Sequence, residues 1–438
     1  MLNLSGRKPL VLLAITSILC AGVLAVQVAR NIRVPIVPRL QPDAPAAIER
    51  PASDTISLMQ DRLRRNPDDA GAYAQLGWAF LQRVRETNDA TQYALSEKAF
   101  DESLARDMNE VDALIGKGAL AASRHQFAAA LNWADRAREQ NPFKAQIFGV
   151  MGDALTELGR YDEAAVIIQK MVDTRPDVSS YSRVSYQREL HGDIPVAIEL
   201  MQRAYGSSNQ TAESGLWVQV QLGNLYFNSG DYERAAQTYA AALHTKPDYV
   251  YAQAGMARVR AAMGDASGAI EIYERIVKTL PMPEFVIALG ELQEHEGRTV
   301  EAKRAYDLVR VIEKLSASGG VDVDLELALF DADHGGDPLE TVIRAREVVA
   351  RRPSVAAFDA LAWSLFRAGN YAEARNYSVK ALALGTRDSM LHFHAGMIAI
   401  ALGDVVSGKT ELEQALKINP HFNVLRADEA RKALVNLH

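Results

Sequence analysis

The sequence predicts an all-α solenoid of about ten helix-turn-helix repeats that follows an N-terminal transmembrane or signal helix. Two observations lead to this fold class. One is a pattern of small and aromatic residues that returns about every 34 residues. The other is an uncharged stretch near the N-terminus, at 9–29. One helix pair cannot bury its own apolar face, so repeated pairs must stack on their neighbours to form a continuous core.

The composition indicates a folded chain and excludes several classes of site. Five of the 48 Lys and Arg side chains lie at positions 1–40, where no acid occurs, so the rest of the chain carries a formal charge of -12. Such a charge repels phosphate backbones, and no nucleic acid is expected as a partner. Cys20 is the only cysteine, which excludes a disulfide framework and cysteine-rich metal sites.

The N-terminal segment, residues 1–30, is expected to be a membrane anchor or a signal segment. Residues 9–29 carry no charge and as a helix would extend about 31 Å, enough to cross a bilayer. Because this apolar run exceeds the usual signal-peptide core, an uncleaved anchor is the first interpretation. Small residues at 23–25 leave open export after cleavage near Ala25. Five prolines make residues 31–53 an extended linker.

The repeated unit is clearest in the middle of the chain. Leu222 and Tyr226 are four residues apart, as expected for one apolar face of a helix. Gly223 is small where two helices approach closely, and Gly230 allows the chain to turn between them. Pro247 ends the second helix because its ring cannot enter the hydrogen-bond ladder. Each slot therefore has a structural reason.

The repeat array is predicted to occupy residues 67–420, between capping helices at 54–66 and 421–438. Three units depart from the pattern: the first by an insertion near 85–92 that should lengthen its turn, the fourth by a polar extension at 206–214, and the eighth by few apolar anchors across 319–352. The units begin near Asp68, Val111, Ala145, Val178, Leu216, Val250, Pro283, Val321, Val355 and Ser389.

This pattern resembles the tetratricopeptide repeat family over about residues 68–420. The resemblance implies a right-handed α-solenoid whose first helices line a concave groove for an extended peptide or a partner helix. It also implies that Asn224 holds a peptide backbone through its amide. The groove positions carried over are Tyr186, Trp217, Asn224, Phe227, Asn228, Tyr251, Arg258, Glu291, Glu294, Trp363, Phe366, Arg367, Phe393 and Met397.

The Trp, Tyr, Phe, Met and Arg residues at these positions are of the types enriched at protein interfaces. The alternative for each aromatic residue is packing between units, away from any partner. Acidic side chains in the third and seventh units, at Asp153, Glu157, Glu291 and Glu294, would suit a basic client.

Residues Gly403 to Thr410 match the phosphate-loop pattern, which makes a nucleotide-binding enzyme a remote alternative. The repeat already explains both glycines, because Gly403 stands in the turn slot and Gly408 in a small-residue slot. His392 and His394 point to different faces of a helix and cannot readily share a metal. We therefore expect no enzyme, cofactor, metal site or small-molecule substrate.

The expected function is a membrane-tethered scaffold whose groove binds a partner polypeptide and supports assembly of a complex. The N-terminal anchor, the proline-rich spacer and the alanine-rich repeats are typical of a bacterial protein with its array outside the cytoplasmic membrane. The alternative is an accessory factor in envelope biogenesis or secretion that presents a client to an enzyme, as in cytochrome maturation or cell-wall assembly. The sequence does not identify the partner.

Overall fold

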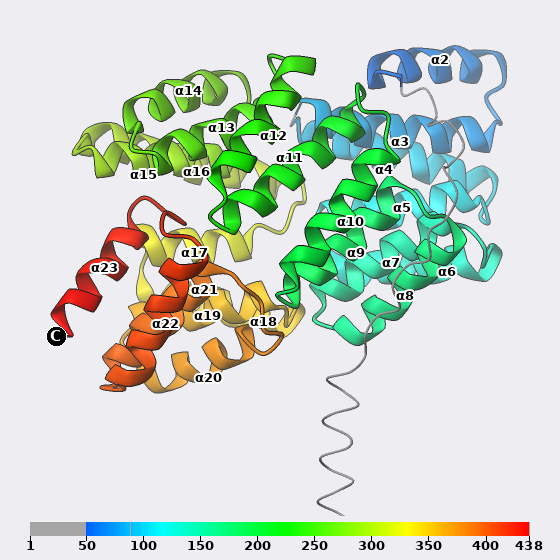
Figure 1. Cartoon of the computed structure of the whole chain (residues 1–438). Coiled ribbons are helices and arrows are strands. Elements are labelled where there is room, and N and C mark those ends of the chain that lie inside the picture. Colours follow the sequence, from blue (N-terminus) through cyan, green and yellow to red (C-terminus); the bar gives the residue numbers. More distant parts are fainter. Residues whose placement is uncertain (1–49, 88, 438) are drawn as a thin grey trace, which may run out of the picture. The chain divides into compact units, whose positions relative to one another are not determined.

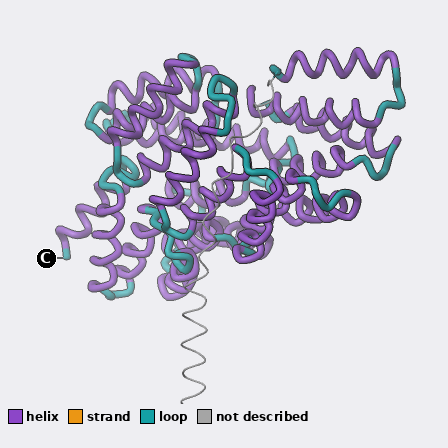
Figure 2. The backbone as a smooth tube through the Cα atoms, turned by 45° about the vertical axis from the view of Figure 1, so that its right-hand side comes forward, coloured by secondary structure: helices purple, strands orange, loops and turns teal. Residues whose placement is uncertain are grey.

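The computed structural model describes residues 50–437 except residue 88, and every regular element in that part is a helix (Figures 1 and 2). The predicted anchor at 1–30 and nearly all of the linker at 31–53 lie outside the described residues. Within the described part, no helix is both long enough and apolar enough to cross a membrane.

Ten antiparallel helix pairs run in order between the flanking helices α2 (Ala52–Arg65) and α23 (Arg426–Asn436), so the all-α repeat fold is confirmed (Figure 1). The first five pairs are α3 (Ala70–Thr87) with α4 (Thr91–Arg106), α5 (Val111–Ser123) with α6 (Phe127–Gln140), α7 (Ala145–Glu157) with α8 (Tyr161–Thr174), α9 (Val178–Leu190) with α10 (Ile194–Gly206), and α11 (Glu213–Asn228) with α12 (Tyr232–Thr245). The next five are α13 (Val250–Ala262) with α14 (Ala266–Thr279), α15 (Pro283–His295) with α16 (Thr299–Ser318), α17 (Asp324–His334) with α18 (Pro338–Arg351), α19 (Val355–Arg367) with α20 (Tyr371–Ala381), and α21 (Ser389–Ala401) with α22 (Val405–Ile418).

Close helix packing explains the small residues of the repeat. Gly223 on α11 and Gly255 on α13 both face the ring of Tyr239 on α12, whose side chain is fully buried. A methyl group at either glycine would collide with that ring. Gly77 and Gly116 enclose Phe100 in the same way near the start of the array. Each large ring thus needs a small residue on the helices at its two sides.

The irregular units keep the helical hairpin. The insertion in the first unit lengthens α3 to Thr87, so the expectation that it lengthens the turn was wrong. In the eighth unit, the buried Asp331 accepts hydrogen bonds from Arg310 at 2.5 Å and from Arg344 at 2.6 Å. Ionic contacts therefore add to the apolar side chains that this unit buries, among them Leu325 and Phe330, so the expectation of few apolar anchors was wrong.

Turns in the first half of the array contact loops in the second half at a regular offset. The backbone N–H of Val355 donates to the Tyr161 hydroxyl at 2.7 Å, across 194 residues. The Asn419 amide, which is buried, donates to the Phe227 carbonyl at 2.9 Å, across 192 residues. The Asp322 carbonyl lies 2.8 Å from His125 Nδ1, across 197 residues. The offset is nearly six repeats, each of about 34 residues. The repeat array therefore winds into a superhelix, and one full turn of this superhelix contacts the next.

Glycines occupy the interhelical turns where this contact is closest. Gly159 lies against the Pro353 carbonyl and Gly192 against the Gly385 carbonyl, both with φ near +70°. The equivalent glycines of the sixth to tenth units also have positive φ, but a methyl group there would meet no other atom within 4 Å; they are Gly264, Gly297, Gly335, Gly369 and Gly403. Those later turns have no unit six places ahead of them on which to dock.

We predict that Gly159→Ala lowers the free energy of unfolding more than Gly264→Ala. Both substitutions place a side chain at positive φ, which costs about 1 kcal/mol. Only the Gly159 methyl would also collide with the backbone of the neighbouring superhelical turn. We expect an additional loss of roughly 1–3 kcal/mol, measured by chemical denaturation. Equal losses for the two variants would contradict the docking of the superhelical turns.

Candidate functional site

The helices α11, α13 and α15 line a hollow of about 800 Å³, here called the middle groove. Its walls carry Trp217, Asn224, Tyr251, Arg258 and Glu291, all of which were predicted as groove residues. Trp217 is 40% exposed, whereas Tyr251 is half-buried and its ring packs edge-on against Phe285. The groove therefore offers an exposed aromatic anchor beside polar and charged groups.

The polar groups of the middle groove are already oriented. The Tyr239 hydroxyl donates to Asn224 Oδ1 at 2.7 Å, which holds the amide in place. The Asn224 amide nitrogen makes only a 3.4 Å contact with Gln221, at the long end of hydrogen-bond distances. Arg258 stacks its guanidinium over the Phe227 ring at 4.1 Å. The Asn224 amide nitrogen thus retains donor capacity for a further acceptor.

Residues 421–424, in the C-terminal part of the chain, also line the middle groove. The Asn423 amide donates to Glu291 Oε2 at 2.9 Å, and Val424 packs against the apolar cluster of α13, α14 and α15. Arg426 then anchors the start of α23 on Asp333 at 2.8 Å. A non-helical stretch of polypeptide therefore already contacts this groove through a side-chain hydrogen bond and an apolar contact.

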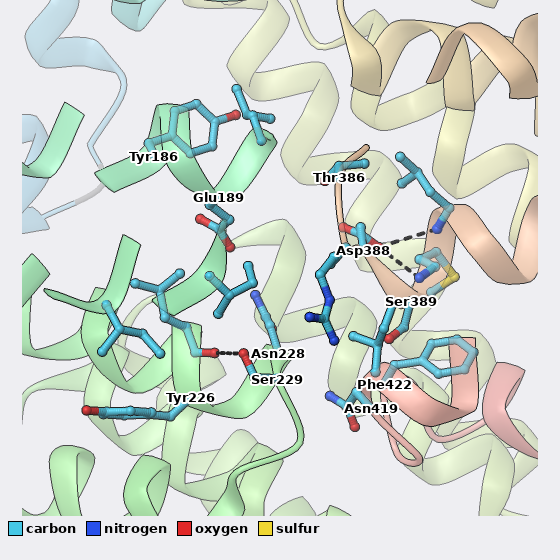
Figure 3. Close-up of a pocket in the computed structure, with 18 of the residues that line it drawn as sticks. Tyr186, Glu189, Tyr226, Asn228, Ser229, Thr386, Asp388, Ser389, Asn419 and Phe422 are labelled. Carbon is cyan, nitrogen blue, oxygen red and sulfur yellow. Dashed lines mark hydrogen bonds between the residues drawn. The ribbon is translucent and has the colours of Figure 1, made fainter. Parts of the chain in front are cut away.

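A second hollow, the inter-turn cleft, has a volume of about 870 Å³ and lies between α9 and α11 on one side and the start of α21 on the other (Figure 3). Tyr186, Glu189 and Asn228 line the first side, and Asp388 and Ser389 line the second. Ser389 is buried, and its hydroxyl has no hydrogen-bond partner among residues 50–437. The docking of consecutive turns creates this cleft.

Carboxyl groups in the cleft hold their protons more tightly than usual. Burial raises the pKa of Glu189 to about 7, with the nearby Asp388 adding to the effect and a hydrogen bond from Asn228 opposing it. Burial also raises the pKa of Asp388, to which Asp359 contributes. The pKa of Glu157 is raised by burial as well. Carboxylates that meet in a space poor in water disfavour ionisation.

Several predicted groove residues are located elsewhere. Trp363 and Phe393 are fully buried, so neither side chain is accessible to a partner. Trp363 stacks on Phe366 and on His394, and its indole N–H donates to Asp333 at 3.0 Å. These aromatic residues follow the alternative interpretation, packing between units, because neighbouring helices cover them on both sides.

The remaining predicted positions differ in exposure. Phe366 and Met397 are half-buried and pack against the core around Trp363. Arg367 is exposed and borders neither the middle groove nor the inter-turn cleft. Glu294 is exposed and accepts a hydrogen bond from Tyr306 at 2.7 Å. These four predicted positions are not part of the middle groove.

The acidic positions of the third unit are likewise outside the middle groove. Asp153 pairs with Arg183 at 2.7 Å, so its charge is already neutralised within the array. Glu157 lines the inter-turn cleft instead. The acidic stretch predicted from the third and seventh units is therefore divided among separate places.

The motifs that suggested other chemistry are parts of the repeat. Gly403 has φ +77° in the turn between α21 and α22, and Gly408 lies inside α22, packed against Ile400. His392 contacts Glu411 at 2.6 Å and His394 contacts Asp359 at 3.0 Å, so the two imidazoles have different partners. The motif lies in a helix-turn-helix. A phosphate loop, in contrast, follows a β-strand.

Sequence reasoning missed the residues that come from distant units. Glu189, Asp388 and Ser389 line the cleft, and Phe422 and Asn423 line the middle groove. The available signal is the polar character of Asp388 and Ser389 just before an apolar helix, which by itself indicates only a helix start. Nothing in the local pattern indicates which unit lies opposite.

We predict that Glu291→Gln makes folding stability less dependent on pH. Burial, together with Asp333, raises the pKa of Glu291 to about 8, while Arg426 and Asn423 oppose the shift. The folded state therefore holds this proton between pH of about 4.5 and 8, and stability falls as the pH rises through that range. At pH 9 the variant should be more stable than the natural chain by roughly 1–3 kcal/mol, and at pH 4 the two should agree. Parallel pH profiles in chemical denaturation would contradict the burial of Glu291.

Comparisons with known proteins agree with the repeat architecture. Three tetratricopeptide repeat family models match residues 116–179, 226–292 and 355–387. No curated protein matches the chain. Among solved structures, a human IFIT1 dimer with PPP-AAAA is 16% identical, with a TM-score of 0.48 over 75% of this chain and 77% of that chain.

Two other solved structures are similar over different shares of the chain. The MamA protein is 16% identical, with a TM-score of 0.30 over 39% of this chain and 91% of that chain. The Cut9–Hcn1 hetero-tetramer of the APC/C is 14% identical, with a TM-score of 0.39 over 88% of this chain and 82% of that chain.

The segments matched by the family models fall on helix pairs of the second and third, the fifth to seventh, and the ninth units, at the places where the small residues and the turn glycines recur. This chain therefore contains tetratricopeptide repeats in these three segments.

Proposed function

We propose that this chain is an interaction scaffold that binds a partner polypeptide in the middle groove and that residues 1–30 tether it to a membrane. The observation that carries the first part is the contact of residues 421–424 with the groove, where Asn423 hydrogen-bonds Glu291 and Val424 packs on the apolar wall. A partner segment with an apolar side chain and a backbone carbonyl would find the same kinds of contact at Trp217 and Asn224.

The groove favours a protein partner over a nucleic acid. Its charged residues include Glu213, Glu284, Glu291 and Asp428 as well as Arg258 and Arg431, so it presents no basic track for a phosphate backbone. Catalysis is not part of the proposal, because the polar groups of the groove form no nucleophile and base pair.

We predict that Trp217→Ala weakens binding of peptides selected from a random displayed library on the purified full-length chain. Loss of this exposed anchor should reduce affinity about tenfold. Val166→Ala is the matched control, because Val166 is exposed on α8 and borders neither the middle groove nor the inter-turn cleft. Isothermal titration with each selected peptide measures the effect. Equal affinity of the two variants would exclude the middle groove as the binding site.

The membrane tether has its own test. The uncharged residues at 9–29 support an uncleaved anchor, and an array outside the cytoplasmic membrane follows from the bacterial character of the sequence. We expect the chain to resist extraction from membranes at alkaline pH and its array to be shielded from added protease in sealed inside-out vesicles. A mature N-terminus near residue 26 would instead show cleavage after Ala25 and contradict the anchor.

A further inference from the structure

A third hollow, here called the acidic cavity, lies between the first two units and α15 to α17 and has a volume of about 1280 Å³. It is a separate space from the inter-turn cleft and meets the middle groove only at Glu284 and Glu291. Among the Lys and Arg residues of the described chain, only Arg124 lines it, whereas seven carboxyl side chains do. The docking of superhelical turns brings these charges together.

Three of the seven carboxylates have an Arg at ion-pair distance. Glu97 pairs with Arg124 at 2.7 Å, Asp333 with Arg426 at 2.8 Å, and Glu326 with Arg352 at 3.7 Å. His334 lies 3.6 Å from Glu291, but burial lowers the pKa of this imidazole and favours its neutral form. Within residues 50–437, four of the other carboxylates have no Lys or Arg at ion-pair distance: Asp89, Glu284, Glu291 and Glu313. The cavity is therefore strongly negative once its acids ionise.

Glu313 on α16 is the residue that indicates a ligand. Its side chain is 2% exposed, it borders the cavity, and neither carboxylate oxygen has a hydrogen-bond partner in the described part of the chain. Arg310, one helical turn earlier, does not reach it because its guanidinium is hydrogen-bonded to Asp331. Burial, with Asp331 and Glu326 adding, raises the pKa of Glu313 to about 7. A buried carboxyl group without a partner is unfavourable for folding.

The spacing of the acidic side chains indicates which kind of cation would fit the cavity. No three His, Asp or Glu groups among the described residues lie close enough to hold one metal ion. The charges are instead distributed along a cavity whose other walls include Ile287, Ile312, Leu329 and Phe330. Lysine and arginine side chains combine an apolar stem with a charged end, so they match both kinds of wall.

We propose that the acidic cavity binds a basic, partly apolar peptide segment of a partner protein, with a Lys or Arg of that segment paired to Glu313. This site is distinct from the middle groove of the proposed function, since the two differ in chemistry and are formed mostly by different helices. A cation beside Glu313 would satisfy both of its unpaired oxygens and favour its charged form.

The test uses a peptide of about nine alternating lysine and leucine residues, titrated onto the full-length chain, with a glutamate-for-lysine peptide as the negative probe. Glu313→Gln should weaken binding of the basic peptide about tenfold. Glu301→Gln is the matched control, because Glu301 is exposed on the same helix, outside the cavity, and its loss changes the net charge equally. Trp217→Ala should leave this affinity unchanged, which separates the cavity from the middle groove.

Three results would overturn the proposal. One is equal affinity of Glu313→Gln and Glu301→Gln for the basic peptide. Another is binding of the glutamate peptide as tight as that of the lysine peptide. The third is tighter binding of spermine than of the basic peptide, with the same dependence on Glu313. That result would assign the cavity to a small polyamine. Circular dichroism verifies that each variant is folded, and Glu326→Gln, at a second carboxylate of the cavity, provides an independent reduction in affinity.

Discussion

The structure depends on one kind of contact, the docking of interhelical turns in the first half of the array onto loops nearly six units further along the chain. In an open solenoid, each repeat touches only its neighbours. Here the turns at His125, Gly159 and Gly192 also lie against backbone of the eighth to tenth units. The approach is backbone to backbone, so it leaves no room for a Cβ atom at Gly159 or Gly192, whose φ angles are positive. His125 is the only non-glycine in the described chain with that conformation, and its ring nitrogen contacts the Asp322 carbonyl.

This docking also determines the electrostatics of the hollows. Glu189 on α9 and Asp388 before α21 would each face water in an open solenoid and would titrate normally. Closure places them on opposite walls of one cleft and raises the pKa of both. The closed arrangement therefore binds protons that an open one would release, so contact between consecutive turns is favoured at lower pH.

The sequence was sufficient for the local architecture and insufficient for the contacts between distant units. It predicted the first helix of every unit to within three residues, because small residues, turn glycines and prolines act within one hairpin. It also placed Trp217, Asn224 and Tyr251 in one groove, since neighbouring units share a register. It left open whether Trp363 lies in the groove or packs between units, because that depends on His394 and Asp333 of the flanking units, which contact its ring. Nor did the sequence predict that Glu313 lines the same cavity as residues of the second unit. That prediction would require knowledge of the pitch of the superhelix.

Glu291 links the middle groove to the acidic cavity, and its chemistry makes the two sites oppose each other. Its hydrogen bond from Asn423 lowers its pKa and so favours its negative charge. Near pH 8, where Glu291 ionises in the folded chain, a client that displaces residues 421–424 from the groove would remove that donor, favour the protonated form of Glu291, and weaken the attraction of the cavity for a cation. Conversely, a cation in the cavity would ionise Glu291, strengthen its bond to Asn423, and hold the C-terminal segment in place. Linkage requires the two effects to be equal in free energy, so each occupant reduces the affinity for the other by the same factor.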